Sequence, residues 1–210
     1  MNLVMLGPPG SGKGTQTKFI CDEHTIPHIS TGDILRDAIK KETALGLEAK
    51  SYIENGELVP DAVIVGVIKE RLKQADAGGG FVLDGFPRNL MQAEALDSFS
   101  HVDSVVEIEV PDDVIVERLT GRRVCPECGS TYHIKSDPPK NENSCDQCGS
   151  KLSQRKDDNE ETIRRRLAVY HEQTEPLKQY YKEKGLLHEV DGTKGIEEIQ
   201  NAIADIIEED

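Results

Sequence analysis

The residues best suited to chemistry form a glycine-rich run, GPPGSGKGT, at positions 7–15. In a phosphate-binding loop, G-x-x-x-x-G-K-[ST], backbone N–H groups and the lysine contact phosphates, and the final hydroxyl contacts magnesium. Gly7, Gly12 and Lys13 match this pattern, but the next residue is Gly14 and the hydroxyl comes one position later, at Thr15. The run is therefore either a chance glycine-rich turn or a phosphate site that holds its metal differently from a GTPase.

A second candidate site is a cluster of cysteines in the second half of the chain. Cys125 and Cys128 form one C-x2-C pair, and Cys145 and Cys148 form another, with 16 residues between the pairs. This spacing is typical of a four-cysteine zinc site, in which four thiolates complete a tetrahedron and the metal is structural. Two disulfides or an iron site are the alternatives, and the apparent lack of an export signal favours a metal. The fifth cysteine, Cys21, is predicted to be a small buried residue of the first helix.

Composition limits the classes of partner. The 210 residues include 39 Asp and Glu against 25 Lys and Arg, which gives a formal net charge of -14. Such a charge opposes binding to nucleic acid or to an anionic membrane surface, because both require a positive field. The chain also contains no apolar run of the roughly 18 residues needed for a membrane span. We expect a monomeric, cytoplasmic protein.

The elements that must position the glycine loop follow from short apolar runs. Residues 2–6 read as a buried strand, and the residues after Lys13 read as a helix, so that the loop has the strand–loop–helix context of a phosphate site. Further strands are expected at 81–85, 104–110 and 186–192, each next to helical segments. This alternation predicts an α/β fold with a doubly wound parallel sheet. Because ligands bind at the carboxyl ends of such strands, the loop and Asp84 should share one edge.

Two helix predictions can be checked in detail. The helix that follows strand 104–110 should begin at Pro111 and Asp112, which we expect to cap its N-terminus. The last helix, within residues 195–209, should be amphipathic. Its predicted apolar stripe consists of Ile196, Ile199, Ile203 and Ile206.

Two segments interrupt the alternation of strands and helices. Residues 30–59 contain helical pieces without a strand, and residues 121–158 contain the four clustered cysteines but few apolar side chains. We therefore expect two inserts, at 30–59 and 121–158, in a core made of residues 1–29, 60–120 and 159–210.

Five motifs in order along the chain resemble those of adenylate kinases, P-loop nucleoside monophosphate kinases, in the long form with a zinc-binding lid. They are GPPGSGKGT at 7–15, STGDILR at 30–36, LDGFPRNLMQAEAL at 83–96, GRRVCPECG at 121–129 and QRKDDNEETIRRRL at 154–167. The resemblance implies that 30–59 binds a nucleoside monophosphate and that 121–158 is a zinc-bearing lid. It implies the reversible reaction of ATP and AMP to two ADP, with Mg²⁺, in adenine nucleotide homeostasis and nucleotide biosynthesis.

The same resemblance implies the ATP-binding residues. Those around the phosphates are Gly10, Ser11, Gly12, Lys13, Gly14 and Thr15. Contacts with ATP from the lid are implied for Arg122, Thr131 and Tyr132, and the backbone near Lys194 would contact adenine. Arg118 would contact a phosphate, and Asp84 would orient magnesium through its bound waters.

The AMP-binding residues are implied in the same way. They are Thr31, Arg36, Glu57, Leu58, Val59, Gly85, Phe86, Pro87, Arg88 and Gln92, with Arg155 and Arg166 bridging the phosphates of both nucleotides. The implied catalytic set is Lys13, Asp84, Arg88, Arg118, Arg122, Arg155 and Arg166. Taken singly, Arg36 or Arg88 could be a surface charge, Gln92 a helix-face amide and Asp84 a cap. Arg123, Arg164 and Arg165 are predicted to be solvated or salt-bridging.

Two other functions remain open at this level. The acceptor could be UMP, CMP or GMP, although the resemblance at Thr31 and Gln92 favours AMP. The protein could instead be a nucleotide switch or a zinc-ribbon module that binds nucleotides or nucleic acid. Against a switch, the chain lacks an N-K-x-D guanine motif, and against a nucleic-acid binder stands its net charge of -14.

Overall fold

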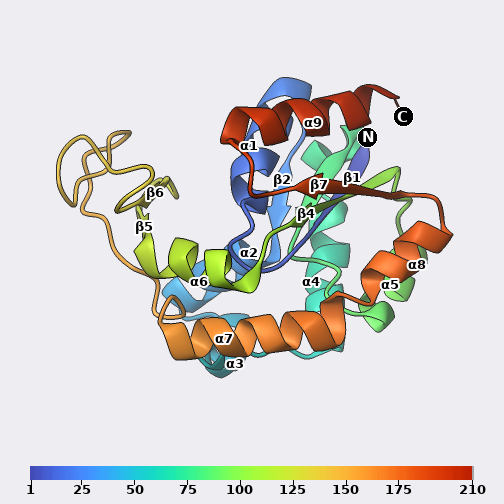
Figure 1. Ribbon diagram of the computed structural model, residues 1–210. Helices are drawn as coiled ribbons and strands as arrows, with labels where there is room; N and C mark the ends of the chain where they lie inside the picture. The colour runs from blue at the N-terminus through green and yellow to red at the C-terminus, as the bar shows by residue number, and fades with distance from the viewer. Residues whose placement is uncertain (210) are drawn as a thin grey trace.

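The structure is a computed structural model that describes residues 1–209. Its centre is a five-stranded parallel sheet with the strand order β2-β3-β1-β4-β7 (Figure 1). The strands are β1 (Asn2–Leu6), β2 (His28–Ser30), β3 (Phe81–Asp84), β4 (Ser104–Glu109) and β7 (Leu187–Asp191). A separate antiparallel hairpin is formed by β5 (Arg122–Val124) and β6 (Thr131–His133).

Helices cover both faces of the parallel sheet. In chain order they are α1 (Lys13–His24), α2 (Thr31–Lys40), α3 (Ala44–Asn55), α4 (Asp61–Leu72), the 3-10 helix η1 (Ala75–Gly79), α5 (Leu90–Asp97), α6 (Asp112–Gly121), α7 (Glu160–Val169), the π-helical turn η2 (Tyr170–Thr174), α8 (Leu177–Glu183) and α9 (Ile196–Glu209). Alternate residues of a strand point to opposite faces. Val4 of β1 accordingly packs with α4 and α5, whereas Met5 packs with α1, α6 and α9. The predicted doubly wound fold is confirmed.

Three details differ from the sequence predictions. Strand β2 was not predicted, because it has three residues and only Ile29 among them is fully buried. The prediction that Asp112 caps α6 is wrong: among residues 1–209 no side chain caps this helix, and the Asp112 carboxylate instead contacts His171. Ile196 is 52% exposed and so lies outside the apolar stripe of α9, while Ile199 and Ile203 are buried.

Residues 121–158 leave the core between α6 and α7. Figure 1 shows the β5–β6 hairpin and its long loops projecting from the ends of these two helices. Isolated bridges join Val124 to Ser153 and Ser144 to Lys151, which folds the loops back on the hairpin. No helix among the residues described is long and apolar enough to cross a membrane.

Candidate active site

The glycine loop connects the carboxyl end of β1 to the first turn of α1. Gly7, Gly10 and Gly12 have φ angles of 130°, 86° and 105°, which side-chain-bearing residues rarely adopt. A Cβ on Gly7 would lie 2.5 Å from the carbonyl oxygen of Ile108, so the loop also packs too closely for a side chain there. Within the described residues no side chain caps the N-terminus of α1. This terminus therefore offers its backbone N–H groups to an anion.

The side chain of Lys13 folds back onto the glycine loop that precedes it. Its Nζ donates hydrogen bonds to the carbonyl oxygens of Gly7 and Pro8 at 2.7 and 2.8 Å. Burial lowers the pKa of Lys13 to about 8, although the nearby Asp84 carboxylate acts in the opposite direction. Burial destabilises the charged form of this lysine, and a bound phosphate would stabilise it.

Asp84 ends β3 beside this loop, as the predicted sheet edge requires. Burial alone would raise its pKa, but His28, whose Nε2 lies 3.4 Å from Oδ2, together with Lys13 holds the pKa below its usual range. A Cβ added to Gly14 would lie 3.6 Å from Asp84 Oδ2. The position at which the usual motif has a hydroxyl thus faces a carboxylate.

A cavity opens on the other side of Asp84, between the 30–59 segment and the β3–α5 loop. Nine residues predicted for AMP binding line it: Thr31, Arg36, Glu57, Leu58, Val59, Gly85, Arg88, Gln92 and Arg166. Phe86, Pro87 and Arg155 do not line it, and Phe86 is fully buried in the core. Sequence reasoning missed Gly32, Leu35, Ile53, Gly56, Ile64 and Asp157, which complete the lining. The sequence could not identify Leu35, Ile53 and Ile64 as cavity residues, because their spacing along the helices is the same as that of residues that pack in a core.

Hydrogen bonds shape the floor of this cavity. Thr31 Oγ1 and Arg88 Nε both donate to the carbonyl oxygen of Gly85, at 2.8 and 2.7 Å. Gly85 has a φ of 77°, and a Cβ there would lie 2.9 Å from both Thr31 Oγ1 and Arg88 Nη2. Burial lowers the pKa of Arg88 to about 10, and no carboxylate in the described part of the chain forms an ion pair with it. Arg88 is therefore a partly buried cation without a protein counterion at hydrogen-bonding distance.

Other arginines gather beside Arg88 and are partly paired with carboxylates. Arg122 donates two hydrogen bonds to the fully buried Asp158, at 2.8 and 2.6 Å. Arg166 Nη1 donates to Asp157 at 2.7 Å, and Arg155 lies 3.9 Å from Asp33. Burial, reinforced by neighbouring guanidiniums, lowers the pKa of Arg155 to about 10. A planar guanidinium can exchange a carboxylate for a phosphate, because both accept the same bidentate hydrogen bonds.

The remaining predicted residues lie at the margins of the site. Arg118 donates to the carbonyl oxygens of Ser11 and Gly192 at 3.3 and 2.8 Å, which joins the glycine loop to the loop after β7. Lys194 lies in that second loop. Arg164 and Arg165 pair with Glu160 and Glu161 on the same helix, as predicted. Arg123 instead donates to backbone carbonyl oxygens.

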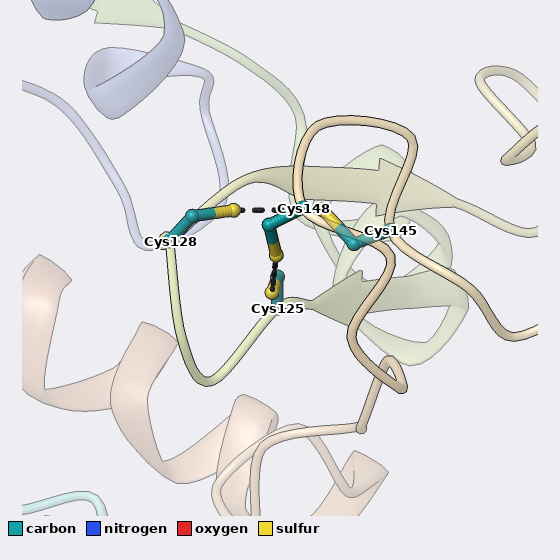
Figure 2. A group of neighbouring side chains, drawn as sticks. All are labelled: Cys125, Cys128, Cys145 and Cys148. Atoms are coloured by element: carbon teal, nitrogen blue, oxygen red, sulfur yellow. Dashed lines mark hydrogen bonds between the residues drawn. The ribbon is translucent and has the colours of Figure 1, made fainter.

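The four clustered cysteines converge on one point. Their Sγ atoms all lie within 4.8 Å of one another (Figure 2), and none of the five cysteines, all within the described residues, forms a disulfide. Gly129 N and Gly149 N donate to the carbonyl oxygens of Cys125 and Cys145, which closes two matching turns around the sulfurs. Four thiolates at this separation suit a tetrahedral zinc ion. The fifth cysteine, Cys21, is half-buried, and burial raises the pKa of its thiol to about 11.

Both predicted ATP contacts on β6 lie near this cluster. Thr131 is exposed, whereas Tyr132 is buried with Cys125, Cys145 and Leu152. The Tyr132 hydroxyl lies 3.5 Å from Cys145 Sγ and accepts a hydrogen bond from Asp146 N at 2.8 Å. The hydroxyl of Tyr132 is thus already engaged inside the lid.

The sequence was compared with those of known proteins. Residues 5–186 match the family model of adenylate kinase. An adenylate kinase of Clostridium beijerinckii is 54% identical over 212 residues, which cover 99% of this chain and 98% of that protein. One from Clostridium perfringens is 54% identical over the full length of both chains. One from Archaeoglobus fulgidus is 53% identical over 213 residues, which cover 99% of this chain and 98% of that protein.

Proposed function

Because this chain belongs to the adenylate kinase family, and its activity is transfer of a phosphoryl group from ATP to AMP, we propose which of its residues perform each part of the reaction. One observation carries the assignment. The uncapped helix N-terminus with Lys13 and the arginine-lined cavity with Arg88 lie on either side of Asp84, at one edge of the sheet. Two phosphate sites next to each other are what direct transfer between two nucleotides requires.

The donor side is the glycine loop. Backbone N–H groups of Gly10 to Thr15 surround the ATP phosphates, and Lys13 leaves its two loop carbonyls to contact the β- and γ-phosphates. Arg118 donates a hydrogen bond to the Ser11 carbonyl oxygen of the loop and contributes positive charge. Arg122 and Thr131 contact ATP from the lid, and the backbone near Lys194 contacts adenine. A Tyr132 contact with ATP remains a prediction, and the hydroxyl of this side chain already accepts a hydrogen bond from Asp146 N.

The acceptor side is the cavity. Arg36 and Arg88 bind the phosphate of AMP, and Gln92, with Thr31, Gly85 and the backbone of residues 57–59, holds the nucleoside. Contacts of AMP with Phe86 and Pro87 remain predictions. Arg155 and Arg166 exchange their carboxylate partners for phosphate oxygens of both nucleotides. Charge that develops on the transferring group is then spread over several fixed guanidiniums, which stabilises the transition state.

Magnesium fits the same edge of the sheet. Asp84 is the residue that would orient its waters, and the ion would neutralise phosphate charge. With Asp84 orienting the waters of magnesium, a hydroxyl at position 14 is not required; a Cβ there would be in ordinary van der Waals contact with the Asp84 carboxylate, at 3.6 Å. Zinc in the four-cysteine cluster is structural, since four thiolates leave no open coordination position.

The inserts explain why AMP and not water accepts the phosphoryl group. We assign residues 30–59 to the AMP-binding insert, 121–158 to the lid, and 1–29, 60–120 and 159–210 to the core. Lys40 lies 3.7 Å from Glu127 and Lys156 lies 3.2 Å from Glu54, so that two parts of the lid contact the AMP insert. Closure of the two inserts excludes water and assembles the arginines. A monomeric state and a cytoplasmic location remain predictions of the sequence.

A comparison of acceptors tests this assignment. Initial rates with saturating MgATP and with AMP, GMP, CMP or UMP should give kcat/KM highest for AMP. The same assay on Arg88→Lys should show KM for AMP rising much more than KM for ATP, because a lysine cannot replace the bidentate fork. Preference for another monophosphate would overturn AMP as the substrate. An equal rise of both KM values would overturn the assignment of Arg88 to the acceptor side.

A further inference from the structure

We propose that Asp61 is a positioning residue that fixes the orientation of the Gln92 amide and thereby sets the preference for a 6-amino purine as the acceptor base. The inference deepens the proposed function and rests on it, since it takes Gln92 as the residue that contacts the base of AMP. It follows from the contacts among Asp61, Arg88, Asn89 and Gln92.

The Gln92 side chain lines the acceptor cavity yet is held at both ends. Gln92 is 2% exposed. Its Oε1 accepts a hydrogen bond from the backbone N–H of Arg88 at 2.7 Å, and its Nε2 donates one to Asp61 Oδ1 at 2.6 Å. Asp61 is itself fixed, because Asn89 Nδ2 donates to the same Oδ1 atom at 2.9 Å.

These two partners allow one amide orientation only. A backbone N–H can only donate, and an ionised carboxylate can only accept. If the amide turned over, Oε1 would face the oxygen of Asp61 and Nε2 would face the N–H of Arg88. Both hydrogen bonds would be lost in a buried place, where unpaired polar groups are costly. Asp61 is also the first residue of α4, where a carboxylate is favoured by the helix dipole.

The fixed amide still has one N–H and one lone pair to offer to a ligand, in a set order. Adenine presents an N6 donor beside the N1 acceptor, which a glutamine amide complements with its carbonyl and its N–H. A 6-oxo purine presents the reverse order, an O6 acceptor beside an N1–H donor, and would need the amide turned over. Asp61 thus turns a side chain that could serve either base into one that serves adenine.

The test compares Asp61→Asn with a matched control. An asparagine at 61 can accept from Asn89 and also donate, so that it tolerates either orientation of Gln92. The control is Asp113→Asn, which removes a carboxylate from the first turn of α6, a helix that also follows a proline but lies outside the cavity lining. The readout is the ratio of kcat/KM for AMP to kcat/KM for inosine monophosphate, with the melting temperature of each variant.

We expect Asp61→Asn to lower this ratio about tenfold, the effect of one or two hydrogen bonds, while Asp113→Asn leaves it unchanged. A general loss of stability would lower both kcat/KM values and leave their ratio unaltered. A ratio within twofold of the wild type, or an equal change in the control, would overturn the proposal. If the wild type itself prefers inosine monophosphate or transfers to neither, the proposed function fails instead.

A measurement on the wild type covers the case in which Asp61→Asn does not fold. In the nucleotide-free protein, one Nε2 proton of Gln92 should exchange slowly with solvent, as followed by nuclear magnetic resonance, because it is hydrogen-bonded to Asp61 in a buried place. Exchange of both protons at the rate of an exposed glutamine would overturn the proposal.

Discussion

The core and the lid of this enzyme are held together by different forces. In the core, fully buried side chains such as Leu3, Leu83 and Val105 pack helices against both faces of the parallel sheet. In residues 121–158, one cluster of four residues is buried, and two of the four are the cysteines Cys125 and Cys145. The region that carries the phosphate loop thus relies on apolar packing, and the 121–158 segment would rely on the metal that its four cysteines are placed to hold.

The difference follows from size. Segments shorter than about 40 residues bury too little apolar surface to fold alone and usually need a metal, disulfides or a partner. A lid built on apolar packing would also expose that surface to water each time it opened. Four thiolates on one ion would join the loops of this segment without requiring a large apolar core.

The largest effect should come from removing the metal. Structural zinc contributes on the order of 10 kcal/mol to folding in zinc-finger peptides, so Cys145→Ala should leave the lid unfolded while the core stays folded. The amides of Gly129 and Gly149, which close the two turns, should lose protection in hydrogen exchange. The control is Cys21→Ala, which removes a cysteine of α1 in the core. In this variant the amides of the lid should keep their protection from exchange. A lid that keeps its protection without metal would contradict the comparison.

The next effect concerns chemistry in the core. Lys13→Met should lower kcat about 10²- to 10³-fold, because one fixed donor to the transferring phosphate is lost. The melting temperature should change little, since Lys13 contributes hydrogen bonds to its own loop alone. Lys18→Met, on the exposed side of the same helix, should retain wild-type turnover. Equal losses in both variants would mean that positive charge on α1, and not its position, supports the reaction.

A pair of leucine truncations separates the two kinds of packing. Leu83→Ala, in the central sheet, should lower the free energy of unfolding by about 2–5 kcal/mol, as measured in denaturant. Leu152→Ala, in the lid cluster, should lower the free energy of global unfolding by less than about 1 kcal/mol while the metal is bound, because Leu152 packs with Cys125, Tyr132 and Cys145 and not with the core. If the lid truncation cost as much as the core truncation, the lid would share the apolar core.

The smallest effect is a pH dependence. Burial lowers the pKa of Lys13 to about 8 in the nucleotide-free enzyme, so the lysine is charged below this pH and neutral above it. Since kcat/KM reports the free enzyme, kcat/KM for ATP should fall as pH rises through about 8. Lys13→Arg should move this limb to higher pH, because arginine stays protonated. An unchanged limb in that variant would assign the ionisation to another group.

Much of the core was predictable because its strands are uniform. Residues 2–6 are a nearly continuous apolar run, and residues 104–109 include the β-branched Val105, Val106 and Ile108, which is typical of parallel strands buried on both faces. Strand β2 gave no such signal, because three residues with one buried isoleucine have no period to detect. The predicted cap of α6 was wrong for a different reason: Asp112 is already the first residue of the helix, the capping position is Pro111, and the Asp112 carboxylate contacts His171.

The candidate site was predictable where chemistry restricts the residue type. Lysine after a glycine loop and paired cysteines have few other uses, and both were identified from spacing. Leu35, Ile53 and Ile64 were missed because an apolar ligand contact and a core contact require the same side chains. The carboxylates that pair with the arginines, Asp157 and Asp158, could not be assigned either, since only the folded chain brings Arg122 and Arg166 to them.

The fate of the terminal phosphate of ATP tests the central claim most directly. With γ-labelled ATP, AMP and Mg²⁺, the label should appear in the β-position of the ADP formed from AMP, and two ADP should form for each ATP consumed. Without AMP, label should enter inorganic phosphate at a small fraction of that rate, because closure excludes water. Label that goes mainly to inorganic phosphate with AMP present would contradict direct transfer between the two sites.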